Sequence, residues 1–166
     1  RAGNVIGGGD WANDRLVPDA MRAFLKRAPL LVRFPDAIRP WQHVLEPLSG
    51  YLLLVERMWD DPHSFSSSWN FGPEQQGITS VDELCGLLAD KFGLGAVCDL
   101  DSSSEPAFHE AKTLYLDITK AKNHLGWLTK WELDIAVANT VEWYKLHDAN
   151  GHVTELTIRQ IDEYSE

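Results

Sequence analysis

The segment Ile38–Val44 (IRPWQHV) constrains the fold of this chain more than any other. It follows a short apolar run typical of a β-strand, Leu30–Phe34, and precedes a long run with helical periodicity. Pro40 biases Arg39 toward an extended backbone, so the guanidinium projects from a stiff segment. A guanidinium presents a planar set of donors that suits a phosphate group. These residues leave two interpretations open: a clamp on a diphosphate, or an Arg paired with a surface carboxylate beside a Trp in the core.

Five longer segments have the apolar periodicity of helices, and short runs that resemble strands separate them. This alternation predicts an α/β fold in which short strands pack against helices. A length of 166 residues favours one domain, residues 1–166. The expected helices are Asp14–Arg27, Val44–Trp59, Thr79–Phe92, Leu133–Leu146 and Thr154–Tyr164, and the expected strands are Arg1–Ile6, Leu30–Phe34, Trp69–Gly72 and Leu94–Leu100.

Three of these helices carry further signals. Asn13 or Asp14 is expected to cap the first helix, and Thr79 or Ser80 the third. The second helix has a broad apolar stripe, so we expect it to be buried on much of its circumference. The stripe consists of Leu45, Leu48, Leu52, Val55 and Trp59, widened by Leu53 and Leu54.

Charge and cysteine content restrict the function. Acidic residues outnumber basic ones by 25 to 15, which gives a net charge of −10 and disfavours nucleic acid and anionic membranes as partners. No apolar run has the length of a membrane span, and no signal-peptide pattern occurs. Cys85, Cys98 and the six His lack the spacings of metal sites, so we predict no metal. A reducing cytoplasm fits this composition best.

No catalytic motif is recognisable in the chain. Gly7–Gly9 follow a strand, but G-x-G-x-x-G is absent and Asp10 and Trp11 crowd the space, so a flexible turn is favoured over a cofactor loop. No Cys–His or Ser–His pair is defined, and Tyr-x-x-x-Lys does not occur. We therefore expect neither catalytic nor cofactor-binding residues in this chain.

Four polar residues are candidates for binding an anionic ligand. Asn4 ends a strand beside the glycines, where its carboxamide either bonds a sugar hydroxyl or phosphate or forms a turn. Arg15 stands at the start of a helix. There it either helps to bind an anion, which the helix dipole favours, or is a solvated surface residue. Arg33 projects from a short strand. Together with Arg39, these arginines could neutralise a diphosphate, although the sequence does not show that they converge.

Several blocks, in order along the chain, resemble CDP-glucose 4,6-dehydratases, which belong to the nucleotide-sugar branch of the extended short-chain dehydrogenase/reductase family. The similarity covers nearly the whole chain, and several ordered blocks are far more specific than one motif. The blocks are Arg1–Asp14 (RAGNVIGGGDWAND), Ile38–Tyr51 (IRPWQHVLEPLSGY), Trp69–Pro73 (WNFGP), His109–Ala111 and Thr140–Lys145 (TVEWYK).

The resemblance implies a function and a binding site. The parent protein would be an NAD-dependent lyase that dehydrates CDP-glucose to the 4-keto-6-deoxy sugar. This chain would bind the nucleotide sugar, while the catalytic Tyr and Lys and the NAD-binding loop would lie upstream of Arg1. A UDP-, dTDP- or GDP-sugar epimerase or dehydratase, and a non-catalytic binding module, are the alternatives. The implied substrate-binding residues are Asn4, Arg15, Leu16, Val32, Arg33, Arg39, Asn70 and His109.

The resemblance also bears on organisation. The chain corresponds to the C-terminal half of family members, so we expect it to be a piece of a longer protein with most of the Rossmann core missing. Residues 1–6 and 69–72 would be edge strands of the nucleotide-binding sheet. The piece would then expose apolar surface, and we predict self-association of the isolated chain and a homo-oligomeric parent enzyme.

Overall fold

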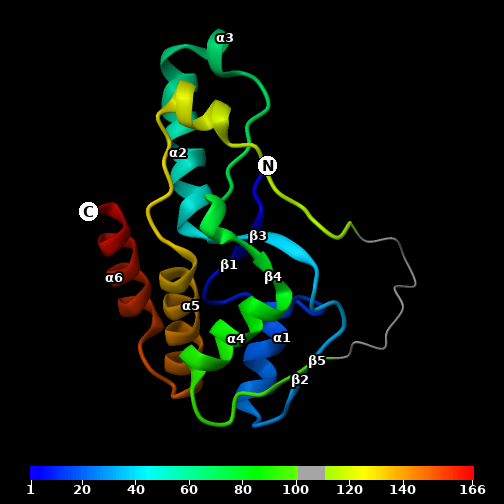
Figure 1. The fold of residues 1–166 in the computed structure, drawn as a ribbon. Coiled ribbons are helices and arrows are strands. Elements are labelled where there is room, and N and C mark those ends of the chain that lie inside the picture. Colours follow the sequence, from blue (N-terminus) through cyan, green and yellow to red (C-terminus); the bar gives the residue numbers. More distant parts are fainter. Residues whose placement is uncertain (101–110) are drawn as a thin grey trace.

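The computed structural model describes residues 1–100 and 111–166, which form an α/β fold (Figure 1). Short strands lie near the middle of the molecule, and helices surround them. The strands are β1 (Asn4–Ile6), β2 (Leu30–Val32), β3 (Ile38–His43), β4 (Ile78–Ser80) and β5 (Cys98–Leu100). The helices are α1 (Leu16–Leu25), α2 (Leu45–Asp60), α3 (Pro62–Phe65), α4 (Val81–Phe92), α5 (Leu133–Asp148) and α6 (Val153–Ser165), with a 3₁₀ turn η1 (Gln75–Gly77) and a π-helical turn η2 (Ala121–Leu125).

Two small sheets organise the strands. In the first, β3 is central: it runs parallel to β1 over its last three residues and antiparallel to β4 over its first three. Pro40 has no N–H and stands where one ladder gives way to the other, which fits its place in a central strand. In the second sheet, β2 and β5 run parallel. The sequence predicted β1, β2 and a strand near β5, but not the strands β3 and β4 or these pairings.

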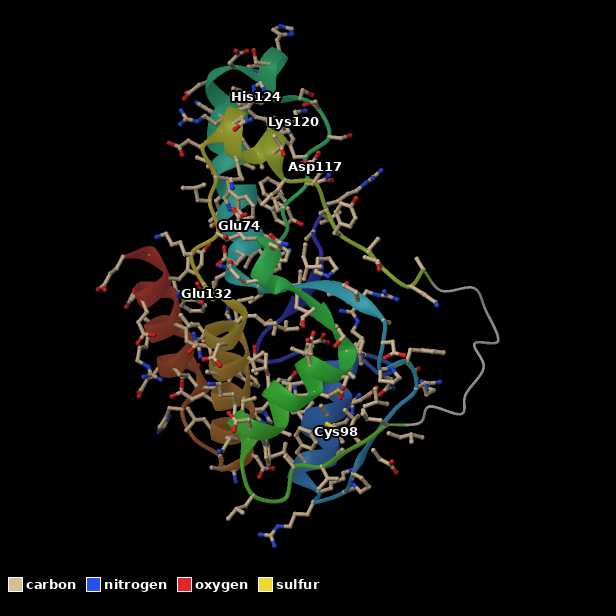
Figure 2. All side chains as sticks on the ribbon, viewed as in Figure 1. Glu74, Cys98, Asp117, Lys120, His124 and Glu132 are labelled. Carbon is tan, nitrogen blue, oxygen red and sulfur yellow. The ribbon has the colours of Figure 1, made fainter. Side chains whose placement is uncertain are left out.

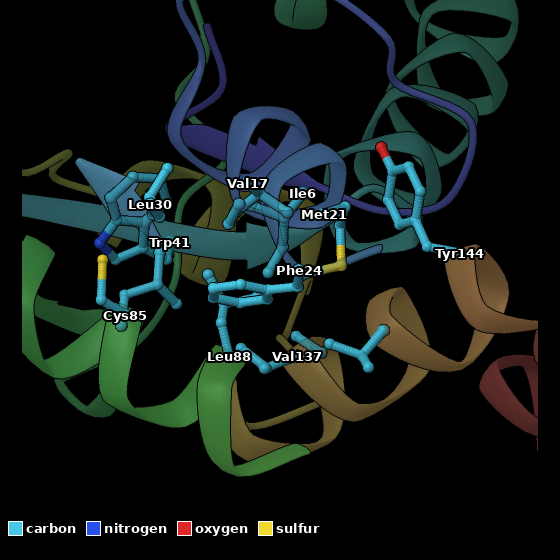
Figure 3. Close-up of a cluster of buried hydrophobic side chains, with 14 of the residues drawn as sticks. Ile6, Val17, Met21, Phe24, Leu30, Trp41, Cys85, Leu88, Val137 and Tyr144 are labelled. Atoms are coloured by element: carbon cyan, nitrogen blue, oxygen red, sulfur yellow. The ribbon is translucent and has the colours of Figure 1, made fainter. Parts of the chain in front are cut away.

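The main core joins α1, α4 and α5 to the strands. Figure 3 shows its side chains, which come from all of these helices and from Ile6, Leu30 and Trp41. The stripe of α1 points into this core, as its periodicity predicted. The fully buried members include Ala20, Met21, Phe24, Leu84, Cys85, Leu88, Ala136, Val137 and Tyr144.

A second, smaller core lies in a part of the molecule that we call the arm, residues 48–72 and 114–128; the other described residues form the body. Helices α2 and α3 and the turn η2 make up the arm in the upper part of Figure 1. Figure 2 places Asp117, Lys120 and His124 in the arm, away from Cys98 in the body. The arm core consists of Trp69, Phe71, Ile118, Ala121, Leu125 and Trp127, with Leu53, Leu54, Phe65 and Leu116 packed against it.

Several details of the predicted helices are confirmed. Ser80 accepts a hydrogen bond from the backbone N–H of Glu83, while the Glu83 carboxylate accepts from Ser80, which completes a capping box at the start of α4. Gly93 follows α4 with φ +89°. The expected cap of α1 is wrong, because Arg15 occupies that position without a side-chain cap and Asp14 has φ +59°.

Two other predictions need correction. The expected burial of the α2 stripe is wrong: Leu48, Leu52, Val55 and Trp59 are 44, 72, 63 and 88% exposed. The reason is that α2 turns its opposite side, with Leu53 and Leu54, toward the arm core. In residues 69–72, only Phe71 makes a strand-like contact, an isolated parallel bridge to Ala2. Assigning this segment and residues 1–6 to the edge of a larger sheet stays a prediction.

Candidate functional site

A cavity of about 680 Å³ opens between β1, the start of α1, β2 and β3. Its lining combines three arginines, three aspartates and apolar side chains. Six of the eight residues expected to bind substrate lie in this lining, although they come from four elements of the chain. They are Asn4, Arg15, Leu16, Val32, Arg33 and Arg39.

Arg39 is the most firmly held of the three arginines. It lies on β3 opposite Thr79 of β4, and 7% of its surface is exposed. Its Nη1 donates hydrogen bonds to the carbonyl oxygens of Ile38 (2.8 Å) and Ala111 (2.9 Å). These backbone acceptors orient the guanidinium at the cavity.

Arg15 and Arg33 lie at the mouth of the cavity, each beside an aspartate. Arg15 Nη1 is 3.4 Å from Asp10 Oδ2, and Arg33 Nη2 is 3.7 Å from Asp14 Oδ1. Both distances exceed the 2.7–2.9 Å typical of tight charge-assisted hydrogen bonds. Both arginine side chains are 65% exposed, so solvent screens these pairs. Contacts of this kind hold the guanidiniums near the cavity but do not immobilise them.

Apolar side chains form the remaining walls. Val32 and Trp41 are buried, and Leu16 is partly buried at the first residue of α1. Asn4 is partly buried on β1, with Trp41 as its register partner on β3. A cavity whose lining combines arginines with aliphatic and aromatic side chains fits a ligand that has both a phosphate group and a planar or sugar portion.

Two expected substrate-binding residues are not placed in the cavity. Asn70 lies in the arm, where its Nδ2 donates a hydrogen bond to the carbonyl oxygen of Asp117 (3.0 Å). His109 lies outside the described residues. The structure therefore brings together the six candidates from the first 39 residues. Asn70 does not line the cavity and lies in the arm instead.

The glycine run after β1 serves packing. A Cβ on Gly8 would lie 2.1 Å from Cγ of Trp143, so the indole of α5 occupies the space beside this residue. Gly9 has φ +81°, which glycine adopts without strain. Gly8 therefore allows the turn to pack closely against α5. The turn favoured from the sequence is the conformation found.

Beyond the cavity, the end of β3 carries buried polar groups. His43 accepts a hydrogen bond from the Leu45 N–H at Nδ1 (3.3 Å), and burial lowers the pKa of His43 to about 4. Glu46 is fully buried, and burial raises its pKa above the usual range despite hydrogen bonds from the Trp131 N–H (2.7 Å) and the Tyr164 hydroxyl (2.8 Å). Glu46 thus joins α2 to α6 and has a structural role.

Nothing in the described ranges gathers three or more His, Cys, Asp or Glu side chains in a way that could hold a metal ion. Cys85 is buried, and burial raises its pKa, which disfavours the reactive thiolate. Among the helices of residues 1–100 and 111–166, none has the length and apolar character needed to span a membrane.

Sequence reasoning missed three residues of the site. Trp41 was recognised as a core candidate, but it also lines the cavity. Asp10 and Asp14 were not considered as partners of the arginines. Three aspartates, Asp10, Asp14 and Asp19, lie near Arg15 in the sequence, and this could have indicated ion pairs. The fold is needed to show which aspartate faces which arginine.

Comparison with known proteins supports the family resemblance. No protein-family model matches the chain. Over 164 residues, the chain is 42% identical to CDP-glucose 4,6-dehydratase of Salmonella typhimurium, a match that covers 99% of this chain and 45% of that enzyme. The chain therefore spans less than half the length of this curated relative.

Solved structures match the fold. UDP-glucuronic acid 4-epimerase from Bacillus cereus, in complex with UDP-glucuronic acid and NAD, superimposes with a TM-score of 0.73 at 18% identity, over 89% of this chain and 44% of that one. An NAD-dependent NDP-hexosamine 5,6-dehydratase of tunicamycin biosynthesis gives a TM-score of 0.70 at 21% identity, over 87% and 44%. The predicted fold class is confirmed: the chain has the α/β fold of the C-terminal half of extended short-chain dehydrogenase/reductase enzymes.

Proposed function

We propose that this chain holds the nucleotide sugar in an NAD-dependent CDP-glucose 4,6-dehydratase, a cytoplasmic lyase that supplies 4-keto-6-deoxy sugars for polysaccharide synthesis. The observation that carries the proposal is the 42% identity to the Salmonella typhimurium enzyme, sustained over 99% of the chain. Bound NAD would supply the hydride acceptor and donor for such a dehydration. The parent enzyme is proposed to be a homo-oligomer.

The cavity supports this role for residues of the chain. Arg15, Arg33 and Arg39 carry three positive charges toward one space, which suits the diphosphate of a nucleotide sugar. Asn4 can donate a hydrogen bond to a phosphate or sugar oxygen, and Val32 offers an apolar surface to the base. Leu16 extends that surface. Asn70 and His109 remain proposed contacts on the family resemblance alone.

Anchorage is the physical contribution of such a site. Contacts with the nucleotide, remote from the reacting carbons, hold the hexose in one orientation against the cofactor and catalytic residues. The chain contains no Tyr-x-x-x-Lys, and its glycine run is packed against Trp143. We therefore propose that the missing half of the parent enzyme binds NAD and supplies catalysis, and that the isolated chain has no dehydratase activity.

Calorimetric titration of the purified chain with CDP-glucose, with UDP-glucose in parallel, tests the anchoring role. We expect CDP-glucose to bind more tightly than UDP-glucose. Arg39→Lys keeps the charge but loses the planar fork, and we expect it to weaken CDP-glucose binding on the order of tenfold. Arg159→Ala is the control, because Arg159 lies on α6 and pairs with Glu142 on α5, away from the cavity.

Each outcome separates the alternatives. Tighter binding of UDP-glucose would favour an epimerase or dehydratase that acts on a UDP-sugar. Binding of neither sugar nucleotide would contradict an anchoring site within this chain. Binding that Arg39→Lys and Arg159→Ala weaken equally would place the site somewhere other than this cavity. Turnover of CDP-glucose by the isolated chain would contradict the proposed division of labour.

A further inference from the structure

The loop Asp10–Asp14 crosses the mouth of the cavity and is fixed from two sides. From α1, Arg22 donates hydrogen bonds to the carbonyl oxygens of Trp11 (3.1 Å) and Ala12 (3.0 Å). From α5, the Tyr144 hydroxyl donates to the carbonyl oxygen of Asp10. The Trp11 ring also packs edge-on against the Tyr144 ring, with centroids 5.0 Å apart. The loop therefore has a defined position relative to the arginines.

Each aspartate of this loop lies beside one arginine, and the Asp10 carboxylate is also held by a backbone hydrogen bond. Asp10 Oδ1 accepts a hydrogen bond from the Ala12 N–H (3.0 Å), and its other oxygen, Oδ2, faces Arg15. Asp14 has φ +59°, a left-handed conformation that Asp and Asn tolerate better than most residues, and its side chain faces Arg33. The loop thus places one carboxylate beside each arginine at the cavity mouth.

Among the described residues, aspartates stand beside the two exposed arginines of the lining. Asp10 pairs with Arg15 and Asp14 with Arg33, while Asp19 pairs with Arg22 of α1. A diphosphate adds negative charge to this space, so it must compete with the carboxylates for the mouth arginines and is repelled by them. Since exposed pairs at 3.4 and 3.7 Å are weak, the exchange is accessible to a ligand.

We propose that Asp10 and Asp14 are internal counter-ions of Arg15 and Arg33: they occupy the place of a ligand's diphosphate, keep the arginines at the cavity mouth, and set the affinity for anions below what the arginines alone would give. The inference rests on the proposed function, since it takes a diphosphate as the ligand. It makes both aspartates positioning residues, because each acts through its arginine.

Asp10→Asn and Asp14→Asn test this with little change to the backbone. Asn keeps an oxygen that can accept from the Ala12 N–H, and it tolerates the left-handed conformation of residue 14. We expect each variant to bind inorganic pyrophosphate and CDP-glucose about 2- to 5-fold more tightly in calorimetric titrations at low salt. The gain should shrink as salt is added, which a purely structural effect would not do.

Glu142→Gln is the matched control. Glu142 forms an ion pair with Arg159 outside the cavity lining, its exposure lies between those of Asp10 and Asp14, and its neutralisation changes the net charge by the same amount. We expect Glu142→Gln to bind both probes as the unmodified chain does. A gain equal to that of the aspartate variants would show a net-charge effect and overturn the inference.

The remaining outcomes distinguish this inference from the proposed function. If the unmodified chain binds CDP-glucose and the aspartate variants bind it equally or more weakly, the counter-ion role fails while the anchoring role stands. If CDP-glucose does not bind but the aspartate variants gain affinity for pyrophosphate, the counter-ion role holds and the anchoring role fails. If no form binds either probe, both fail.

Discussion

Helix α1 in the body and helix α2 in the arm both carry an apolar stripe at helical spacing, yet the stripe of α1 lies in the core and that of α2 is exposed. The buried residues of α1 include Met21 and Phe24, which contact side chains of other helices and strands. On α2, the buried residues are Glu46, Pro47 and Gly50 near its start, whereas Leu52 and Trp59 are exposed.

This difference shows what periodicity does and does not report. An apolar stripe indicates which face of a helix gains from removal from water. Whether a covering element is present depends on the rest of the fold. In the body, α1, α4 and α5 cover one another, while in the arm only the side of α2 that carries Leu53 and Leu54 is covered by described residues.

Truncation in the body core should have the largest effect. Phe24 is buried between α1 and the other core elements, with its ring 5.3 Å from that of Phe92. We expect Phe24→Ala to lower the free energy of unfolding by about 3–5 kcal/mol, through lost burial and a residual cavity. Urea denaturation followed by circular dichroism measures it. A loss below about 1 kcal/mol would mean that this core is not close-packed.

Acid should weaken the body through His43. Because burial lowers the pKa of His43 to about 4, the folded protein binds this proton less readily than the unfolded chain does. Stability is then complete above pH 6.5 and decreases as the pH falls toward 4, by about 3 kcal/mol for a pKa difference of about 2.5.

The variant His43→Asn isolates this effect. Its side-chain oxygen can replace Nδ1 as the acceptor for the Leu45 N–H, and it does not titrate. The raised pKa of Glu46 acts in the opposite direction in both proteins, since that stability is lost as the pH rises. We expect urea melts from pH 7 to pH 4.5 to destabilise the unmodified chain more than the variant. Parallel pH profiles would contradict a neutral buried His43.

The caps of two helices, one in the body and one in the arm, test the same difference with smaller expected effects. Ser80 caps α4, whose Leu84 and Leu88 are fully buried, while Asp61 caps the four-residue helix α3, which buries no residue. We expect Ser80→Ala to cost about 1 kcal/mol of unfolding free energy, and Asp61→Ala to cost clearly less. Thermal melts of the two variants compare them. Equal costs would show that the arm unfolds together with the body.

The exposed stripe of α2 should affect association more than stability. Leu52→Ser and Trp59→Ser leave the net charge unchanged, and we expect each to change the unfolding free energy by less than about 0.5 kcal/mol. Sedimentation velocity should show self-association of the unmodified chain that these variants reduce. Ile158→Ser on α6 is the control, because Ile158 is an exposed apolar residue of the body, outside the α2 stripe. A monomeric unmodified chain would contradict the prediction.

Local signals predicted most helices and the strands β1, β2 and β5. The starts of α4 and α5 and the extents of α1, α2 and α6 were close to those expected, because periodicity and caps depend on neighbours within one or two turns. The strands β3 and β4 and the helix α3 were missed. Three residues such as Ile78–Ser80 form a strand only because β3 lies beside them, which no local pattern encodes.

The site was predicted in part. Residue chemistry and family resemblance pointed to Arg15, Arg33 and Arg39 as phosphate ligands, and the structure places all three in one cavity lining. Their role with a ligand stays a prediction. The carboxylates beside Arg15 and Arg33 were missed, because electrostatic partners depend on distance in space rather than on order in the chain.

Residue identity and local spacing are enough to predict most helical segments, the acidic net charge, the absence of a Tyr-x-x-x-Lys motif and the family resemblance. The folded chain is needed to see that β3 joins β1 to β4, that the arginines share a cavity with Asp10 and Asp14, and that the stripe of α2 is exposed. These depend on contacts between distant segments, and such contacts form only when the whole chain has folded.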